Sequence, residues 1–185
     1  MSDKAVFLDR DGVVNVDHAY VYKIDDFEFI AGVFDACQLF QAAGYKIVIV
    51  TNQSGIGRGY YTEQDFHTLT DWMVAQFKQH NVEISKVYFC PHHPTKGVAQ
   101  YKQQCDCRKP KPGMLLQGVK ELGLDPSKCI MFGDKGSDML AAKAAGFSKK
   151  ILVQSGQSFD EQTITLADDV WQSLNCAGEK FSENT

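Results

Sequence analysis

Short apolar segments that suit buried β-strands alternate with segments of helical period along most of the chain. The expected strands cover residues 5–8, 46–50, 86–89, 129–132 and 151–153, and the expected helices cover residues 34–44, 62–77, 112–122, 139–145 and 164–174. Strands that alternate with helices favour a parallel sheet with helices on both of its faces. We therefore predict an α/β fold with a Rossmann-like, doubly wound parallel sheet.

Several of the expected helices carry recognisable start and stop signals. Gly44 and Gly146 are suited to follow the last turn of a helix. Thr62 and Asp65 form a capping-box pattern at a helix start. Pro112 suits the first turn of the helix that follows it.

The length of the chain limits the number of domains. At about 100–200 residues per domain, its 185 residues correspond to one domain spanning residues 1–185. A domain of this size buries about 70% of the surface of its unfolded chain, so it needs no disulfide framework to fold. The six cysteines are therefore free to serve other purposes.

The charge and the hydropathy pattern limit the partners. Nineteen basic and 23 acidic residues give a net charge of -4, which does not suit binding to nucleic acid through a broad basic face. The sequence has no run of about 18 apolar residues that could cross a membrane, and no secretion signal is recognisable near its start. We expect a monomeric cytoplasmic protein without a nucleic-acid or membrane partner.

Acidic and hydroxyl side chains cluster where three of the expected strands end. Asp9 and Asp11 follow the first strand, Thr51 follows the second, and Asp134 follows the fourth. In a doubly wound sheet, ligands bind beyond the carboxyl ends of the strands. Crowded carboxylates repel one another and suit Mg²⁺, which also binds substrate phosphate. The alternative is that Asp9 and Asp11 are turn residues that only cap the loop.

Two loops could complete an anion site at this edge. The segment 51–59 is rich in glycine and hydroxyl groups, so it is either a nest of backbone N–H groups or an ordinary mobile loop. Arg108, Lys109 and Lys111 precede an expected helix, although such charge runs are usually solvated surface. Carboxylates, a hydroxyl and a lysine at one edge together favour a site for a phosphoryl group.

Soft metal ligands gather in the irregular stretch between residues 90 and 107. The set consists of Cys90, Cys105, Cys107 and either His92 or His93. Three thiolates and one imidazole are typical of structural zinc, whereas the alternative is a chance grouping of buried cysteines and surface histidines. We expect Zn²⁺ to fix this loop and thereby to position Arg108 and Lys109.

Taken in order, the polar motifs resemble the four motifs of the haloacid dehalogenase-like phosphatases. The matching segments are Asp9-x-Asp11-Gly12, Thr51, Lys109 and Gly133-Asp134-x-x-x-Asp138. The resemblance spans nearly the whole chain and implies a magnesium-dependent phosphatase. The segment 15–30 is too short for the separate α/β cap of larger relatives, so we expect a capless core with a zinc-binding loop.

The resemblance implies a role for each motif residue. Asp9 would be the nucleophile that forms an aspartyl-phosphate, and Asp11 would be the general acid and base. Thr51 and Lys109 would donate hydrogen bonds to the phosphoryl oxygens. The implied ligands of Mg²⁺ are Asp9, Asp11 through its backbone carbonyl, and Asp134, with Asp138 behind them.

Two zinc-loop subfamilies are similar to the chain, the D-glycero-D-manno-heptose-1,7-bisphosphate 7-phosphatases and the histidinol-phosphate phosphatases. The chain is more similar to the first, on segments 9–12, 15–20, 51–56, 90–94, 105–110 and 133–135. This resemblance implies removal of the 7-phosphate from a small sugar bisphosphate, for ADP-heptose and lipopolysaccharide synthesis or for GDP-heptose. It selects His92 as the zinc ligand. It assigns substrate contacts to Asp17, His18, Ala19, Tyr20, Thr51, Asn52, Gln53, Ser54, Arg108, Lys109 and Lys135.

The chain departs from the subfamily pattern in places, and rival interpretations exist. Ala19 stands where glycine is common in the subfamily, which leaves the catalytic groups intact. The rival from another class is a receiver-like signalling domain, which also gathers a phospho-accepting aspartate, a hydroxyl and a lysine on a parallel sheet. The spacing of Asp9 and Asp11 and the cysteine cluster oppose that reading.

Overall fold

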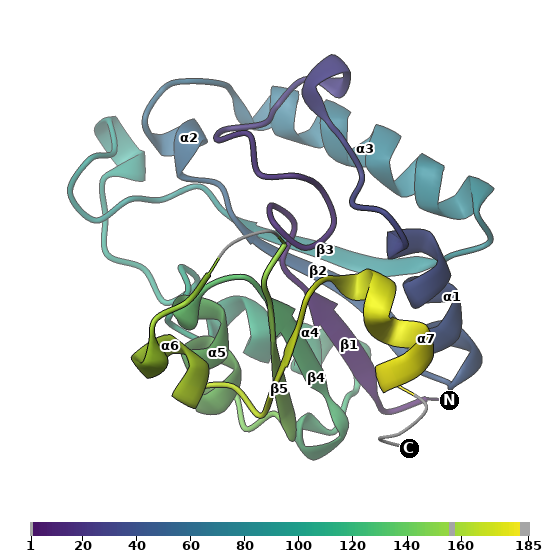
Figure 1. Cartoon of the computed structure of the whole chain (residues 1–185). Coiled ribbons are helices and arrows are strands. Elements are labelled where there is room, and N and C mark those ends of the chain that lie inside the picture. The colour runs from purple at the N-terminus through teal and green to yellow at the C-terminus, as the bar shows by residue number, and fades with distance from the viewer. Residues whose placement is uncertain (1, 156–157, 182–185) are drawn as a thin grey trace.

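A six-stranded parallel sheet organises the part of the chain that this computed structural model describes, residues 2–155 and 158–181 (Figure 1). The remaining residues of the expected 1–185 domain lie outside this description. The strands are β1 (Ala5–Leu8), β2 (Lys46–Asn52), β3 (Ile84–Cys90), β4 (Ile130–Gly133), β5 (Lys149–Val153) and β6 (Asp169–Trp171). Their order in space is β3-β2-β1-β4-β5-β6, and every neighbouring pair is parallel.

Helices cover both faces of this sheet, which confirms the doubly wound prediction. One face packs against α1 (Val33–Ala42), α3 (Glu63–Gln79) and α7 (Ala177–Lys180). The other face packs against α4 (Gly113–Leu122) and α5 (Gly136–Ala144). Short elements complete the chain: α2 (Ser54–Gly57), α6 (Glu161–Thr165) and the 3₁₀ turns η1 (Ile24–Asp26), η2 (Ala99–Tyr101), η3 (Pro126–Lys128) and η4 (Leu174–Cys176).

Strand β1 shows why the strands are continuously apolar. Val6 and Leu8 point into the core beneath α1 and α3, whereas Ala5 and Phe7 point into the core beneath α4 and α5. Successive side chains of a strand alternate between the two faces, so a strand covered on both faces needs apolar residues throughout.

The expected helix signals are present. Asp65 N donates to Thr62 Oγ1 at 3.1 Å and Thr62 N donates to Asp65 Oδ2 at 2.8 Å, which completes the capping box of α3. Gly44 and Gly146 follow α1 and α5 with φ values of +84° and +79°, a conformation that glycine adopts without strain. Pro112 is the residue that precedes the first turn of α4.

The predicted helix over residues 164–174 is wrong. Helix α6 ends at Thr165, and the strand β6 follows it and pairs with β5. The reason is burial, because Trp171 packs its ring 5.1 Å from that of Phe132 and is almost inaccessible to solvent. Aromatic and β-branched residues suit such a strand, and tertiary packing here overrides the local helical spacing.

The order of the strands indicates at which edge of the sheet a ligand would bind. The chain continues from β1 to one side of the sheet and from β4 to the other, so the topological switch point lies between β1 and β4. Ligands bind beyond the carboxyl ends of the strands at such a point. The carboxyl ends of β1, β2 and β4 are therefore the expected site.

Candidate active site

A buried lysine stands at the centre of this edge. Nζ of Lys109, from the loop before α4, lies 2.9 Å from Asp9 Oδ1 and 2.6 Å from Asp138 Oδ1. It also donates to the carbonyl of Val50 at 2.9 Å. The residue is only 3% exposed, so these charges interact in a poorly solvated environment. All three donor positions of the ammonium group are thereby used.

The backbone of Lys109 is held by a residue far away in sequence. Asn52, the last residue of β2, donates from Nδ2 to the carbonyl of Lys109, and the N–H of Lys109 donates back to Asn52 Oδ1, both at 3.1 Å. The Asn52 amide thus pins the lysine loop onto the end of the sheet. The resemblance assigned Asn52 to substrate binding, and these two contacts show that its side chain already binds the protein backbone.

The protonation of this cluster is set by burial and by neighbouring charges. Burial raises the pKa of Asp9 to about 6, and the charge of Asp138 adds to this rise while Lys109 opposes it. Burial by itself would lower the pKa of Lys109, but Asp138 and Asp9 outweigh that effect and hold it above its ordinary value. Lys109 is therefore a permanent cation at neutral pH.

Asp134 is the member of the cluster whose surroundings most clearly favour a bound cation. Both of its carboxylate oxygens are buried and neither has a hydrogen-bond partner among the described residues. Burial, with the charges of Asp9 and Asp138, raises its pKa to about 9. A Cβ atom at Gly12 would lie 2.2 Å from Asp134 Oδ2, so the chain passes this carboxylate closely only because residue 12 is glycine.

The carboxylates fit a hard divalent cation. One oxygen from each of Asp9, Asp134 and Asp138 lies within 4.8 Å of the others. Hard oxygen ligands are those that Mg²⁺ prefers, and a cation would satisfy the unpartnered oxygens of Asp134. Asp138 is already engaged elsewhere, because its Oδ1 contacts Lys109 and its Oδ2 accepts from the N–H of Lys135 at 3.2 Å.

Asp11 is oriented by three side-chain donors. Arg10 and Asn15 both donate to Oδ1 at 3.0 Å, and Gln53 Nε2 donates to Oδ2 at 3.1 Å. Gln53 also donates to Thr51 Oγ1 at 2.8 Å, so one amide contacts both predicted catalytic side chains. Unlike Asp9, the carboxylate of Asp11 is partly exposed.

The segment 17–20 forms a tight turn beside this site. Asp17 Oδ1 accepts from the N–H of Ala19 at 3.0 Å, and Ala19 and Tyr20 both adopt the left-handed conformation. Glycine, the residue that the resemblance leads us to expect at position 19, adopts this backbone without strain. The carboxylate of Asp17 is close enough to Lys135 to help raise its pKa, after Asp134 and Asp9, against the lowering effect of burial.

The remaining residues that we predict to contact the substrate differ in their exposure and in their contacts with the protein. His18 is exposed and lies 3.1 Å from Glu28 Oε2. Ser54 opens α2 and is partly exposed. Arg108 donates to the carbonyl of His92 at 3.3 Å, which ties it to the cysteine loop. Tyr20 is exposed and packs edge-on against Tyr60.

The cysteine loop brings four soft ligands together. Sγ of Cys107 lies 3.0 Å from that of Cys90 and 3.3 Å from that of Cys105, and His92 Nδ1 lies 3.6 Å from Cys107 Sγ. The hydrogen bond with Cys90 outweighs the effect of burial and lowers the pKa of Cys107 to about 5, which favours the thiolate form that binds metal, whereas the same contact, together with burial, raises the pKa of Cys90. His93 is turned away, because its Nδ1 accepts from the N–H groups of Thr95 and Lys96. This group can hold a metal ion.

Three residues of the site were not singled out in the sequence. Arg10 is 1% exposed and reaches the carbonyl of Val21 at 2.7 Å as well as Asp11. Asn15 is buried beside Asp11, and the hydroxyl of Tyr61 donates to Gln53 Oε1. The alternation of charge in Asp9-Arg10-Asp11 was the available signal for Arg10. Local sequence gives no sign of the contact of Tyr61.

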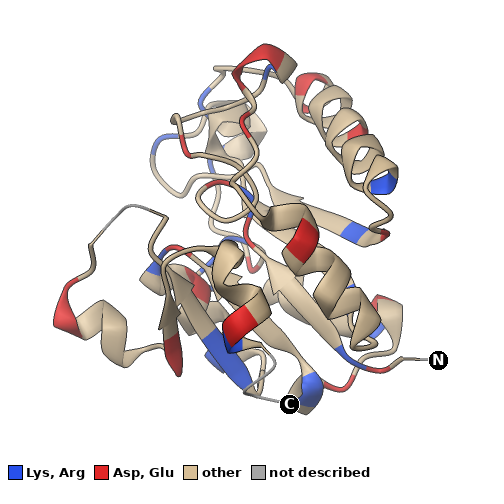
Figure 2. Cartoon of the chain, turned by 45° about the vertical axis from the view of Figure 1, so that its right-hand side comes forward, with Lys and Arg blue, Asp and Glu red and all other residues tan. Residues whose placement is uncertain are grey.

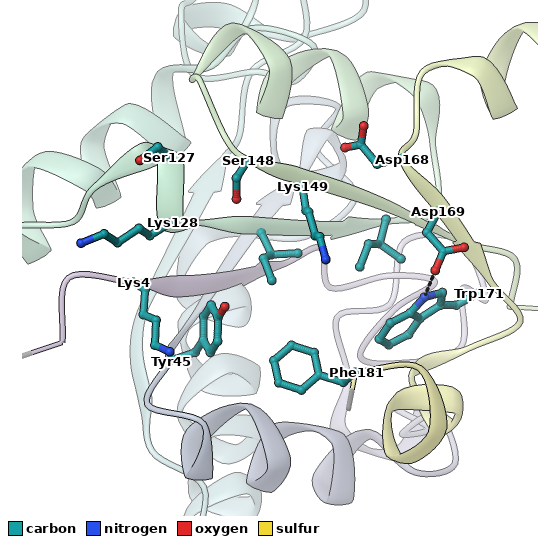
Figure 3. A pocket seen from close by; sticks show the side chains of 12 residues that line it. Lys4, Tyr45, Ser127, Lys128, Ser148, Lys149, Asp168, Asp169, Trp171 and Phe181 are labelled. Atoms are coloured by element: carbon teal, nitrogen blue, oxygen red, sulfur yellow. Dashed lines mark hydrogen bonds between the residues drawn. The ribbon is translucent and has the colours of Figure 1, made fainter. Parts of the chain in front are cut away.

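A separate hollow lies at the opposite edge of the sheet (Figure 3). It has a volume of about 320 Å³, and most of its lining residues lie at or just before the amino ends of strands, among them Lys4, Lys128 and Lys149. Some of its charged groups have partners, because Lys128 contacts Asp3 at 2.6 Å and Asp169 accepts from Trp171 Nε1 at 2.7 Å. None of the predicted catalytic residues is among the residues that line this hollow.

Basic and acidic residues are interspersed along the ribbon in the view of Figure 2. Among residues 2–155 and 158–181, no helix has both the length and the apolar character needed to cross a membrane.

Comparisons with known proteins agree with this geometry. The sequence profile of the haloacid dehalogenase-like hydrolases matches residues 3–146. The chain is 52% identical to the D-glycero-beta-D-manno-heptose-1,7-bisphosphate 7-phosphatase of Vibrio cholerae serotype O1, over 94% of both chains. It is 49% identical to the enzyme of the same name from Escherichia coli K12, over 92% of this chain and 89% of the relative.

Solved structures show the same relationship. The D,D-heptose 1,7-bisphosphate phosphatase of B. bronchiseptica, complexed with magnesium and phosphate, superposes with a TM-score of 0.82 at 29% identity over 98% of this chain and 99% of that one. The corresponding phosphatase of Burkholderia thailandensis gives a TM-score of 0.65 at 25% identity over 97% and 98%. The chain therefore belongs to the haloacid dehalogenase-like hydrolase family.

Proposed function

We propose that the chain is a magnesium-dependent phosphatase that removes the 7-phosphate of D-glycero-β-D-manno-heptose 1,7-bisphosphate, in the synthesis of ADP-heptose for lipopolysaccharide. The observation that carries the proposal is the buried set of Asp9, Lys109 and the unpartnered Asp134 at the switch point of the sheet. The names of relatives about 50% identical over nearly their whole length support this sugar and its β anomer.

Asp9 is placed to act as the nucleophile. The N–H of Arg10 and Nζ of Lys109 both donate to Oδ1, each at 2.9 Å, so the carboxylate is fixed through one oxygen. We propose that Oδ2 attacks phosphorus. The new Oδ2–P bond then forms as the bond between phosphorus and the sugar oxygen breaks, which gives an aspartyl-phosphate and replaces one difficult displacement with two easier ones.

Asp11 supplies and removes the proton in these two steps. Its carboxyl group gives a proton to the leaving sugar oxygen, and the resulting carboxylate then takes a proton from the water that attacks the aspartyl-phosphate. Three donors occupy three of its roughly four lone-pair positions, which leaves about one position for the transferred proton. The second step breaks the Oδ2–P bond and restores Asp9.

Asp9, Asp134 and the backbone carbonyl of Asp11 would hold Mg²⁺. The bound ion supplies positive charge that offsets the repulsion between the Asp9 carboxylate and the phosphate dianion. Thr51 donates to the phosphoryl oxygens, where negative charge spreads in the transition state. Lys109 donates to them by exchanging one of its three present contacts. Asp138, which contacts Lys109 at 2.6 Å, keeps that lysine charged and in position.

We further propose that Zn²⁺ occupies the Cys90, His92, Cys105 and Cys107 cluster as a structural ion. Four protein ligands leave no open position for catalysis, which is typical of structural zinc. Because Cys107 directly precedes Arg108 and Lys109, a metal at this point would order the two cations that face the substrate phosphates.

A substrate panel tests the proposed function. Phosphate release is measured with Mg²⁺ on the two anomers of the heptose bisphosphate, on fructose 1,6-bisphosphate and on histidinol phosphate. We expect the β anomer to give the highest kcat/KM and the heptose 1-phosphate as product. A preference for histidinol phosphate would replace the sugar assignment, and a single stoichiometric phosphorylation without turnover would support a receiver-like domain instead.

A further inference from the structure

The amide of Gln53 is fully engaged with the protein. Gln53 is 2% exposed, and its Nε2 donates to Asp11 Oδ2 at 3.1 Å and to Thr51 Oγ1 at 2.8 Å. An amide nitrogen has two hydrogens, so both are used. The side chain therefore has no N–H left for a substrate, and its contacts suit the positioning of the two catalytic side chains.

Tyr61 holds the other end of this amide. Its hydroxyl donates to Gln53 Oε1, and burial raises the pKa of Tyr61, so the hydroxyl remains protonated. The ring of Tyr22 stacks on that of Tyr61 at 5.0 Å with an angle of 6° between the planes. A Cβ atom at Gly55 would lie 2.2 Å from Tyr61 Cε1, so the tyrosine fills the space that this glycine leaves.

The amide of Gln53 lies between Asp11 and Tyr61. The amide nitrogen of Gln53 faces Asp11 Oδ2, and its oxygen faces the hydroxyl of Tyr61. The tyrosine hydroxyl stabilises this orientation of the amide by donating a hydrogen bond to that oxygen. Without the hydroxyl, the amide oxygen would be buried without a hydrogen-bond donor, which costs free energy. Rotation of the amide away from its present position would then become favourable.

We infer that Tyr61 is a positioning residue, which acts through the amide of Gln53 to hold Asp11 in the geometry for proton transfer to the leaving group. This inference rests on the proposed role of Asp11. It concerns one side-chain hydroxyl that does not reach the reacting atoms, so its effect depends on the intervening amide. Tyr61 and Gln53 should consequently behave as one unit when they are changed together.

The test compares Tyr61→Phe with the wild-type enzyme on two kinds of substrate. One is an alkyl phosphate, whose leaving oxygen needs a proton, and the other is p-nitrophenyl phosphate, whose leaving group departs as a stable anion. We expect kcat on the alkyl phosphate to fall about tenfold, the loss of one buried hydrogen bond, with KM unchanged. We expect kcat on p-nitrophenyl phosphate to change by less than about threefold, since general-acid help matters little there.

Tyr88→Phe is the matched control. Tyr88 is as buried as Tyr61, at 6% exposure, and its hydroxyl donates at 2.6 Å to Oε2 of Glu121, which lies near the end of α4. A purely structural cost of losing a buried tyrosine hydroxyl would appear in both variants, as a similar fall in Tm. We expect only Tyr61→Phe to lower kcat on the alkyl phosphate more than kcat on p-nitrophenyl phosphate.

A double-mutant cycle completes the test. In a Gln53→Ala background, Tyr61→Phe should have no further effect on kcat. Equal losses on both substrates, a change in KM alone, or independent effects of the two substitutions would overturn the inference. The proposed sugar can fail separately, because the comparison uses generic phosphate esters. A wild-type protein that releases phosphate from neither ester nor the heptose bisphosphate would overturn the proposed function itself, and with it this inference.

Discussion

Nζ of Lys109 lies 2.6 Å from Oδ1 of Asp138, and both side chains are almost completely buried. The ammonium group is shared with Asp9, so one cation offsets the charge of two carboxylates inside the protein. Removal of one partner from a buried pair leaves an uncompensated charge, which costs far more than the pair itself contributes. The lysine therefore has a structural effect that accompanies its proposed role toward phosphate.

We expect Lys109→Met to destabilise the magnesium-free protein by about 3–5 kcal/mol, as other broken buried pairs do. Added Mg²⁺ should recover part of this loss, because it offsets the same carboxylates. Lys150→Met is the control, since Lys150 contacts the half-exposed Asp168 at 2.7 Å and such pairs contribute at most about 1 kcal/mol. Urea unfolding of both variants measures the difference, and equal losses would contradict the account.

The stability of the magnesium-free protein should fall as the pH rises from about 4 to about 9. Burial raises the pKa of Asp134 to about 9 in the folded protein, whereas an unfolded aspartate titrates near about 4. Between these values the folded protein keeps a proton that the unfolded chain has lost, so the free energy of unfolding decreases with pH. Urea midpoints across this range measure the slope.

Two comparisons identify Asp134 as the source of this slope. Asp134→Asn has no carboxyl group to titrate, so its unfolding free energy should depend less on pH. Saturating Mg²⁺ should flatten the wild-type dependence and should not do so in the variant. An unchanged slope in Asp134→Asn would show that another group is responsible.

Loss of the metal from the cysteine cluster should weaken substrate binding. We expect Cys107→Ser to lose bound zinc and to raise KM about tenfold, the lower end of the 10–100-fold loss of metal affinity or activity that is typical when a metal site loses a supporting group. Cys176→Ser is the control, since Cys176 lies in η4 outside the cluster. Elemental analysis and steady-state kinetics measure both effects. A zinc-free protein with an unchanged KM would contradict the positioning role.

The sequence was sufficient to predict five of the six strands and the residues at their carboxyl ends. Strands buried on both faces must be continuously apolar, so segments such as β1 were visible, and Asp9 and Asp134 were placed by the strands that precede them. The strand β6 was missed because it has only three residues, and because the packing of its Trp171 against Phe132 depends on the complete tertiary structure.

Contacts between distant segments could not be predicted in this way. Asn52 and Lys109 are 57 residues apart, and their paired hydrogen bonds exist only because β2 and the loop before α4 meet at one edge. The contact of Tyr61 with Gln53 spans only eight residues, but the position of Tyr61 carries no periodic or motif signal, although Gln53 lies in the segment 51–56 that the resemblance singles out. The residue types indicated the chemistry of the site. Only the tertiary structure showed that polar side chains such as Asn52 and Gln53 bind other parts of the protein and hold the site residues in place.

The most direct test of the mechanism is chemical trapping at Asp9. In an Asp11→Asn variant, hydrolysis of the aspartyl-phosphate should slow, so brief incubation with substrate and Mg²⁺, acid quenching and borohydride reduction should convert Asp9 to homoserine. Peptide mass spectrometry should find this product at position 9 only when substrate and Mg²⁺ are both present. Turnover by the variant without modification at position 9, or reduction at another residue, would contradict the account.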